Sequence, residues 1–169
     1  MQERVILVDK DDVVCGDMEK MQAHEEGLLH RAFSVFVFNS QGALLLQRRA
    51  HGKYHSGGLW TNTCCSHPRP GESILGAAQR RLVEEMGFVC DLTHQFTFEY
   101  RAELENGLIE HEIDHVFSGH YEGSVSPDPT EVAEYQYVEV DELARQIQTR
   151  PERFTPWLKT VWADYRSCF

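Results

Sequence analysis

The sequence predicts an α+β protein with a mixed β-sheet, folded as a single domain over residues 1–169. Strand-like segments come before and after one strongly periodic helix, without the regular strand–helix alternation of a doubly wound fold. A chain of 169 residues, 41% of them hydrophobic, is long enough to bury one core. The sequence contains no repeat, low-complexity tract or linker that would divide it.

The first half of the chain predicts three short strands. Residues 5–8 are apolar and end at an acidic turn over residues 9–12. The Phe- and Val-rich segment 31–38 ends at Asn39-Ser40-Gln41-Gly42, and a second apolar segment follows at 43–48. Two apolar runs joined by turn-forming residues are the pattern of a β-hairpin.

Residues 72–86 predict the central helix, because apolar residues recur there at helical spacing and Gly87 is a suitable C-cap. Arg81 precedes Glu84 and Glu85 by three and four residues, so the three side chains share one ridge. They either form helix salt bridges worth about 0.3–0.5 kcal/mol, or Glu85 binds a metal while Arg81 contacts an anionic substrate. Spacing does not separate these alternatives.

The second half predicts three further strands and two closing helices. Strands are expected at 96–104, 108–121 and 135–140, the first two joined through Glu105-Asn106-Gly107. Asp141 is expected to cap a helix that reaches residue 148, and Thr155-Pro156 to open another that reaches residue 165.

Composition and charge argue against several classes of function. The net charge of −11 disfavours a general binder of nucleic acid or anionic membranes, although a local cluster of Lys and Arg can still hold an anionic substrate. Five cysteines without a CxxC pair do not form a secreted disulfide framework. The sequence shows neither a signal peptide nor a run of ~20 apolar residues. We therefore expect a cytoplasmic protein.

Histidines and carboxylates suggest a metal site. Glu110 and Glu112 stand at i and i+2 on a predicted strand, so both side chains can enter one pocket. With His24, His30 and His67 they would give a mixed nitrogen and oxygen site for Mn²⁺, Zn²⁺ or Mg²⁺. Each residue alone is equally well explained as an ordinary surface side chain.

A thiol and several cations complete the candidates. Cys64 and Cys65 are adjacent, so in an extended segment they face opposite ways and only one can line a given cleft. A thiol beside a metal or a cation can exchange protons near neutral pH, whereas buried cysteines are commonly inert. The Arg48-Arg49 pair, Lys20 and Lys53 are candidate phosphate ligands, or else solvated loop cations.

The chain resembles the type I isopentenyl diphosphate isomerases, enzymes with a Nudix fold, from about Lys20 to Trp157. The resemblance implies a mixed β-sheet sandwiched between helices. Its motifs are His24…His30, Arg48-Arg49, Trp60-Thr61-Asn62-Thr63-Cys64-Cys65-Ser66-His67-Pro68, Arg80-Arg81…Glu84-Glu85-x-Gly87, Tyr100-Arg101-Ala102, Glu110-His111-Glu112 and Pro156-Trp157.

The resemblance also implies a chemistry, in which one proton is added to the substrate's carbon skeleton and another removed. Cys65 and Glu112 match the two acid/base groups, with Tyr100 hydrogen-bonded near Glu112. The implied ligands of one divalent metal (Mn²⁺, Zn²⁺ or Mg²⁺) are His24, His30, His67, Glu110 and Glu112. Glu85 would hold a second ion, Mg²⁺, bridging to the diphosphate. The implied diphosphate contacts are Lys20, Arg49, Lys53 and Arg81, and Trp157 would face the carbocation. The expected partner is an isoprenoid diphosphate, bound by a monomer or a weak homodimer.

Two positions depart from related patterns. The spacing from His24 to His30 is one residue shorter than in the family. Arg81 stands where a Nudix hydrolase carries a metal-binding Glu, which favours diphosphate anchoring over pyrophosphate hydrolysis. The alternatives are therefore a Nudix pyrophosphohydrolase and a non-catalytic metal-binding scaffold.

Overall fold

A mixed β-sheet forms the centre of the computed structural model, which describes residues 2–169. Strand β3 pairs in parallel with β8 along its whole length, and its other edge meets β1, β6 and β4 in turn, all antiparallel. Strands β2, β7 and β9 extend the sheet through β1, β8 and β4. The strands in this described chain are β1 Arg4–Val8, β2 Val14–Glu19, β3 His30–Phe38, β4 Leu44–Arg49, β5 Trp60–Thr61, β6 Cys64–Ser66, β7 Thr93–Glu103, β8 Ile109–His120 and β9 Val132–Val138.

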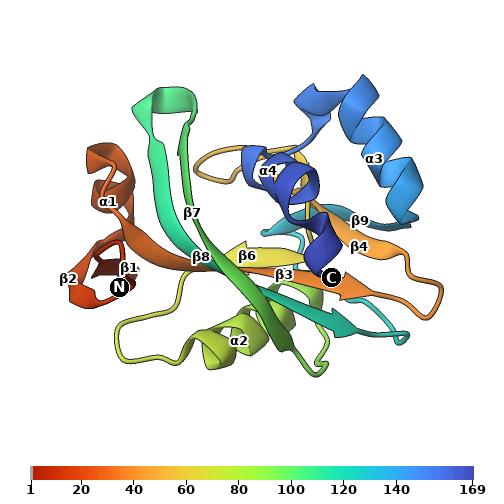
Figure 1. Cartoon of the computed structure of the whole chain (residues 1–169), viewed down its shortest axis with the longest axis horizontal. Helices are drawn as coiled ribbons and strands as arrows, with labels where there is room; N and C mark the ends of the chain where they lie inside the picture. The colour runs from red at the N-terminus through yellow and green to blue at the C-terminus, as the bar shows by residue number, and fades with distance from the viewer. Residues whose placement is uncertain (1) are drawn as a thin grey trace.

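Helices cover both faces of the sheet, which confirms the predicted fold class. Helix α2 (Ile74–Met86) lies below the sheet in Figure 1, and α3 (Val140–Thr149) and α4 (Pro156–Asp164) lie above it. The short helix α1 (Lys20–Glu26) packs against β8 and the β1–β2 hairpin. Single 3-10 turns occur at Glu105–Gly107, Pro151–Arg153 and Arg166–Cys168. Within residues 2–169, no helix combines the length and the apolar character that crossing a membrane requires.

Alternation along β3 separates the two halves of the core. Phe33, Val35 and Val37 pack toward α2, whereas Phe36 and Phe38 pack toward α3 and α4. A strand buried on both faces has this nearly continuous apolar sequence. On the face of the sheet toward α3 and α4, only the second half of β3 is apolar, because the first half of the strand carries His30 and Ser34 there. The polar end of this face is where the candidate site lies.

The structure corrects the sequence-based elements in several places, among them β9, which spans Val132–Val138 where residues 135–140 were expected. The segment containing β2 and α1 was not predicted, since most of β2 is exposed and lacks an apolar alternation. The cap of α3 is Glu139, whose carboxylate accepts from the backbone of Asp141 and Glu142, so the prediction of Asp141 was wrong. The expected hairpin of β3 and β4 is joined by one residue pair, Phe38 with Leu44, because β6 and β8 pair along the two edges of β3.

Helix α2 has well-formed ends. The Ser73 hydroxyl accepts from the backbone N–H of Gly76 at the N-terminus. At the C-terminus Gly87 has a φ of 75° and its N–H donates to the carbonyl of Val83. A Cβ at Gly87 would lie 2.3 Å from the backbone oxygen of Ser126, so glycine is required here for space as well as for φ.

Gly87→Ala is expected to destabilise the protein by about 2–4 kcal/mol, the sum of left-handed strain and overpacking against a backbone atom. Gly42→Ala is a matched control, because Gly42 has a similar φ of 78° but a Cβ there would meet nothing within 4 Å. Chemical denaturation should show a loss of about 1–2 kcal/mol for the control. Equal losses in the two variants would contradict the role of the Ser126 contact.

Candidate active site

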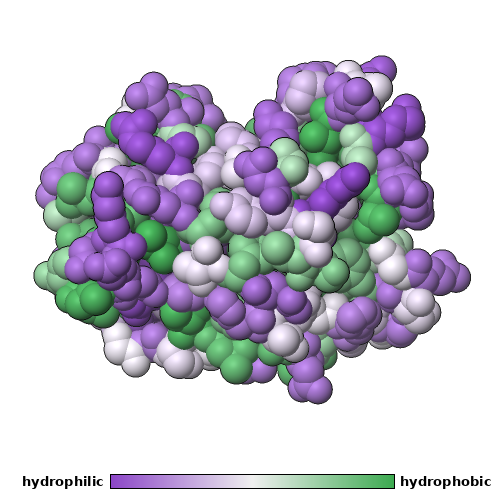
Figure 2. Space-filling model, in the orientation of Figure 1, coloured by the Kyte–Doolittle hydropathy of each residue, from purple (hydrophilic) through white to green (hydrophobic). Residues whose placement is uncertain are grey.

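The candidate active site is a cavity of about 80 Å³ above the polar end of β3. Its walls include Ser34 of β3, Cys65 of β6, Glu112 of β8 and Trp157 of α4. The space-filling view shows hydrophilic residues on both sides of a hollow between the β7–β8 hairpin and the C-terminal helices (Figure 2). Small-molecule sites commonly measure about 300–1,000 Å³, so the cavity is small for a site of this kind.

Three predicted histidines meet beside this cavity. His24 comes from α1, His30 opens β3 and His67 follows β6; all three are buried. One nitrogen from each lies within 4.8 Å of the other two. The short spacing between His24 and His30 is accommodated because α1 ends at Gly27 in a left-handed conformation, and the chain turns directly into β3.

Hydrogen bonds orient two of these rings. Nδ1 of His24 lies 2.7 Å from the carbonyl of Lys20, and Nδ1 of His30 lies 2.8 Å from that of Leu28. A ring that donates from Nδ1 has its lone pair on Nε2. Among the described residues, neither Nε2 has a hydrogen-bond partner. Buried, oriented imidazoles with unpaired nitrogens fit a divalent metal ion.

Two buried carboxylates from β8 face the same space, as their spacing predicts. Glu112 Oε2 lies 2.9 Å from His67 Nε2 and 3.4 Å from His30 Nε2. Burial opposes ionisation of Glu112, but the close contact with the His30 imidazole prevails and lowers the pKa of Glu112. Burial and the charge of Glu112 raise the pKa of Glu110. The two carboxyl groups therefore differ in character, with Glu112 the one held as a carboxylate.

Tyr100 and Asp114 lie beside this pair. Tyr100 stands opposite Glu112 in the β7–β8 ladder, but in the described chain its hydroxyl has no hydrogen-bond partner, so the expected hydrogen bond is not formed here. Asp114, which the sequence reasoning did not consider, accepts a hydrogen bond from Ser34 Oγ at 2.8 Å. Burial and the charge of Glu112 raise its pKa. The wall beside Glu112 thus carries a hydroxyl group and a carboxyl group whose protonated form burial favours.

His55 is another residue that sequence reasoning missed. It is 1% exposed, and its Nε2 lies 2.7 Å from Glu110 Oε1. Burial lowers its pKa although Glu110 acts in the opposite direction. No spacing pattern marks His55, since the residues it meets are distant in sequence and only the fold brings them together.

The two adjacent cysteines separate as predicted. Cys65 lines the cavity, and burial raises the pKa of its thiol, so the thiol is protonated at neutral pH. Cys64 lies on the opposite face of the sheet and donates a hydrogen bond to Glu85 Oε2 at 2.7 Å. Glu85 is 2% exposed, and burial raises its pKa despite the nearby Arg81. Cys64 therefore supports a carboxylate on α2 while Cys65 faces the cavity.

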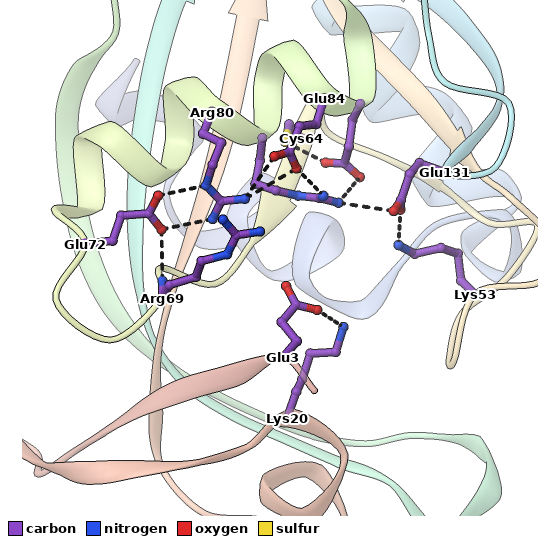
Figure 3. A network of polar contacts seen from close by, with 11 residues as sticks. Glu3, Lys20, Lys53, Cys64, Arg69, Glu72, Arg80, Glu84 and Glu131 are labelled. Carbon is purple, nitrogen blue, oxygen red and sulfur yellow. Dashed lines mark hydrogen bonds and ion pairs between the residues drawn. The ribbon is translucent and has the colours of Figure 1, made fainter. Parts of the chain in front are cut away.

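Four of the candidate phosphate ligands, Lys20, Arg49, Lys53 and Arg81, line the cavity, whereas Arg48 is not among the described residues that line it. Carboxylates pair with three of the four. Lys20 Nζ lies 2.7 Å from Glu3, and Lys53 contacts Glu131. Arg81 Nη2 lies 3.5 Å from both Glu131 Oε1 and Glu85 Oε1. Glu131 therefore bridges Lys53 and Arg81, and Figure 3 shows its contact with Lys53.

Arg49 is the exception among these cations. Its Nη2 donates to the carbonyl of His55 at 3.0 Å, and its guanidinium lies 5.2 Å from the Trp157 ring centre. Glu85, by contrast, is buried, lies 3.5 Å from Arg81 Nη2 and is not among the described residues that line the cavity.

The fold and the site together define a member of the NUDIX family, whose domain pattern matches residues 28–158. Within that family the chain belongs to the isopentenyl-diphosphate Delta-isomerases. The protein of that name from Pectobacterium atrosepticum is 52% identical over 168 residues, covering 98% of this chain and 94% of the relative. That from Burkholderia multivorans is 56% identical over 157 residues, covering 93% and 89%. The resemblance seen in the sequence motifs is thereby confirmed.

Solved structures support the fold. A protein from Deinococcus radiodurans superposes with a TM-score of 0.81 at 19% identity, over 99% of both chains. A MutT protein from Methanosarcina mazei gives 0.67 at 18% identity, over 80% of this chain and 91% of the other. At such low identities these similarities establish the architecture alone.

Proposed function

We propose that this protein interconverts isopentenyl diphosphate and dimethylallyl diphosphate. The observation that carries the proposal is the placement of Cys65 and Glu112. They come from β6 and β8, the neighbours on opposite edges of β3, and both line one cavity with cations around it. The names of the relatives agree with this activity.

The reaction requires one proton donor and one proton acceptor. Adding a proton to the terminal carbon of the double bond leaves a tertiary carbocation, and losing a proton from the carbon nearer the diphosphate forms the new double bond. We assign these transfers to Cys65 and Glu112, one giving a proton and the other taking one. Trp157, on the cavity wall, would stabilise the cation through its ring face, and a largely enclosed site would keep water from capturing it.

The charge states of the two groups suit these roles. Burial keeps the Cys65 thiol protonated, whereas His30 keeps Glu112 ionised. An acid and a base therefore coexist at neutral pH. Tyr100, opposite Glu112, would act as a positioning residue for the substrate or the carboxylate.

The residues that would hold a divalent metal are those that the resemblance implies: His24, His30, His67, Glu110 and Glu112. This donor set suits Mn²⁺ or Zn²⁺ and admits Mg²⁺. A bound ion would supply positive charge that polarises Glu112. Glu85 remains our proposed holder of Mg²⁺ on the diphosphate side.

The diphosphate would be held by Lys20, Arg49, Lys53 and Arg81. Because Glu3 and Glu131 pair with three of these cations, the phosphate oxygens would take the places of carboxylate oxygens. The cavity would then open as substrate enters. The five cysteines, all free among residues 2–169, support our proposal of a reducing cytoplasmic location.

Glu131→Gln is expected to tighten binding of inorganic pyrophosphate roughly 3- to 10-fold, because Lys53 and Arg81 lose a competing carboxylate. Isothermal titration calorimetry in the presence of Mg²⁺ measures this. Glu134→Gln is the control, since Glu134 is exposed and its carboxylate lies 3.8 Å from Arg48, which is outside the cavity lining of the described residues. Weaker binding by Glu131→Gln would contradict the competition and show that Glu131 helps to hold the ligand.

The proposed activity is tested with isopentenyl diphosphate and Mg²⁺, with Mn²⁺ or Zn²⁺ added in parallel assays. Formation of dimethylallyl diphosphate without release of phosphate is the expected result. Release of phosphate without isomer would refute the proposal and identify a pyrophosphohydrolase instead. Arg81, in the place of a hydrolase glutamate, leads us to expect the first outcome.

A further inference from the structure

His55 repeats the arrangement of the predicted metal-binding histidines. Its Nδ1 lies 3.1 Å from Ser56 Oγ, a hydroxyl that can accept from Nδ1 as the carbonyl oxygens beside His24 and His30 do. Its Nε2 points into the site and, among the residues that the structure describes, makes no hydrogen bond of acceptable geometry.

His55 also meets other metal-binding side chains. One ligand atom from each of His24, His55 and Glu110 lies within 4.8 Å of the other two. One of these contacts joins His55 Nε2 to Glu110 Oε1 at 2.7 Å. His24 thus belongs to two groups of possible ligands, one with His30 and His67 and one with His55 and Glu110.

The loop that carries His55 is fixed from several sides. Arg49 donates to the carbonyl of His55 at 3.0 Å. The His55 ring packs edge-on against Tyr54 and Trp157, with ring centres 4.3 and 5.7 Å away. Such packing holds the ring in one orientation before any ion arrives. Preorganised ligands of this kind lower the entropic cost of binding.

We propose that His55 is a further ligand of the divalent metal, binding it through Nε2 together with His24 and Glu110. This rests on the metal-dependent activity proposed above, but it concerns a residue outside the implied ligand set. A fourth imidazole favours borderline ions such as Zn²⁺, Co²⁺ or Mn²⁺ over Mg²⁺, because imidazole nitrogen is a poor ligand for Mg²⁺.

Cobalt(II) is a suitable probe, because its visible absorption reports the ligand set directly. Metal-stripped full-length protein is titrated with Co²⁺ against a competing chelator, and the spectrum of the complex is recorded. His55→Ala is expected to weaken Co²⁺ binding roughly 10- to 100-fold and to change the absorption spectrum. His51→Ala, at an exposed histidine of the same loop, should change neither.

Two outcomes would overturn the proposal. One is a wild-type affinity and spectrum in His55→Ala. The other is a weakened affinity with an unchanged spectrum, which would make His55 only a positioning residue for Glu110. His55→Gln, with thermal unfolding of each metal-free variant, ensures that a folding defect is not mistaken for a lost ligand. Because the readout is metal binding, a negative result is distinct from failure of the isomerase assay with wild-type protein.

Discussion

Cys65→Ala and Glu112→Gln are each expected to lower turnover roughly 10²–10⁴-fold, the usual contribution of a positioned acid or base. Each substitution removes one of the two groups between which the protons must move. Substrate affinity should change little, because the diphosphate is held by cations elsewhere on the cavity wall. Steady-state kinetics of dimethylallyl diphosphate formation give kcat and KM separately.

Cys64→Ala provides the internal control for the thiol. Cys64 faces α2 and donates to Glu85, so its loss should leave kcat within a few fold of the native value. If Cys64→Ala were the inactivating change and Cys65→Ala were silent, our assignment of the thiol would be wrong. A KM effect of Glu112→Gln with an unchanged kcat would likewise remove Glu112 from the proton transfers.

Arg81→Ala is expected to raise the KM for isopentenyl diphosphate about 10²-fold, equivalent to about 3 kcal/mol. The guanidinium lies on the cavity wall in contact with Glu84, Glu85 and Glu131, and it can transfer its donors to phosphate oxygens. The substitution also leaves the buried Glu85 without its cation, which should further weaken diphosphate binding.

Arg80→Ala is the matched comparison for Arg81. Arg80 is the preceding residue on the same helix, but it pairs with Glu72 and Glu84 and does not line the cavity formed by the described residues. The KM of the Arg80→Ala variant should stay close to that of the native protein. An effect of Arg81→Ala confined to kcat, with KM unchanged, would contradict the anchoring role.

The sequence predicted best those elements whose signals are local. Helix α2 was predicted because its apolar spacing and Gly87 cap lie within one segment, and the β7–β8 hairpin because Glu105-Asn106-Gly107 marks its turn. Strand β2 was missed because it forms an exposed edge beside β1 and needs no apolar face.

The distinction between local signals and long-range packing also applies to the candidate site. The shared face of Glu110 and Glu112 and the opposite faces of Cys64 and Cys65 follow from the period of a strand. The position of His55 depends on how a loop packs against α4 and β8, which no local pattern encodes. Nor does any spacing reveal Glu131, whose partner Lys53 lies 78 residues away in the sequence.

The ion pairs around the cavity also bear on how fast substrate is captured. Carboxylates neutralise Lys20, Lys53 and Arg81 at short range, and the whole chain carries a net charge of −11. A diphosphate approaching through solvent is therefore repelled at long range and gains its favourable contacts only on arrival. Raising the ionic strength should consequently speed association, the reverse of what an openly basic binding site would show.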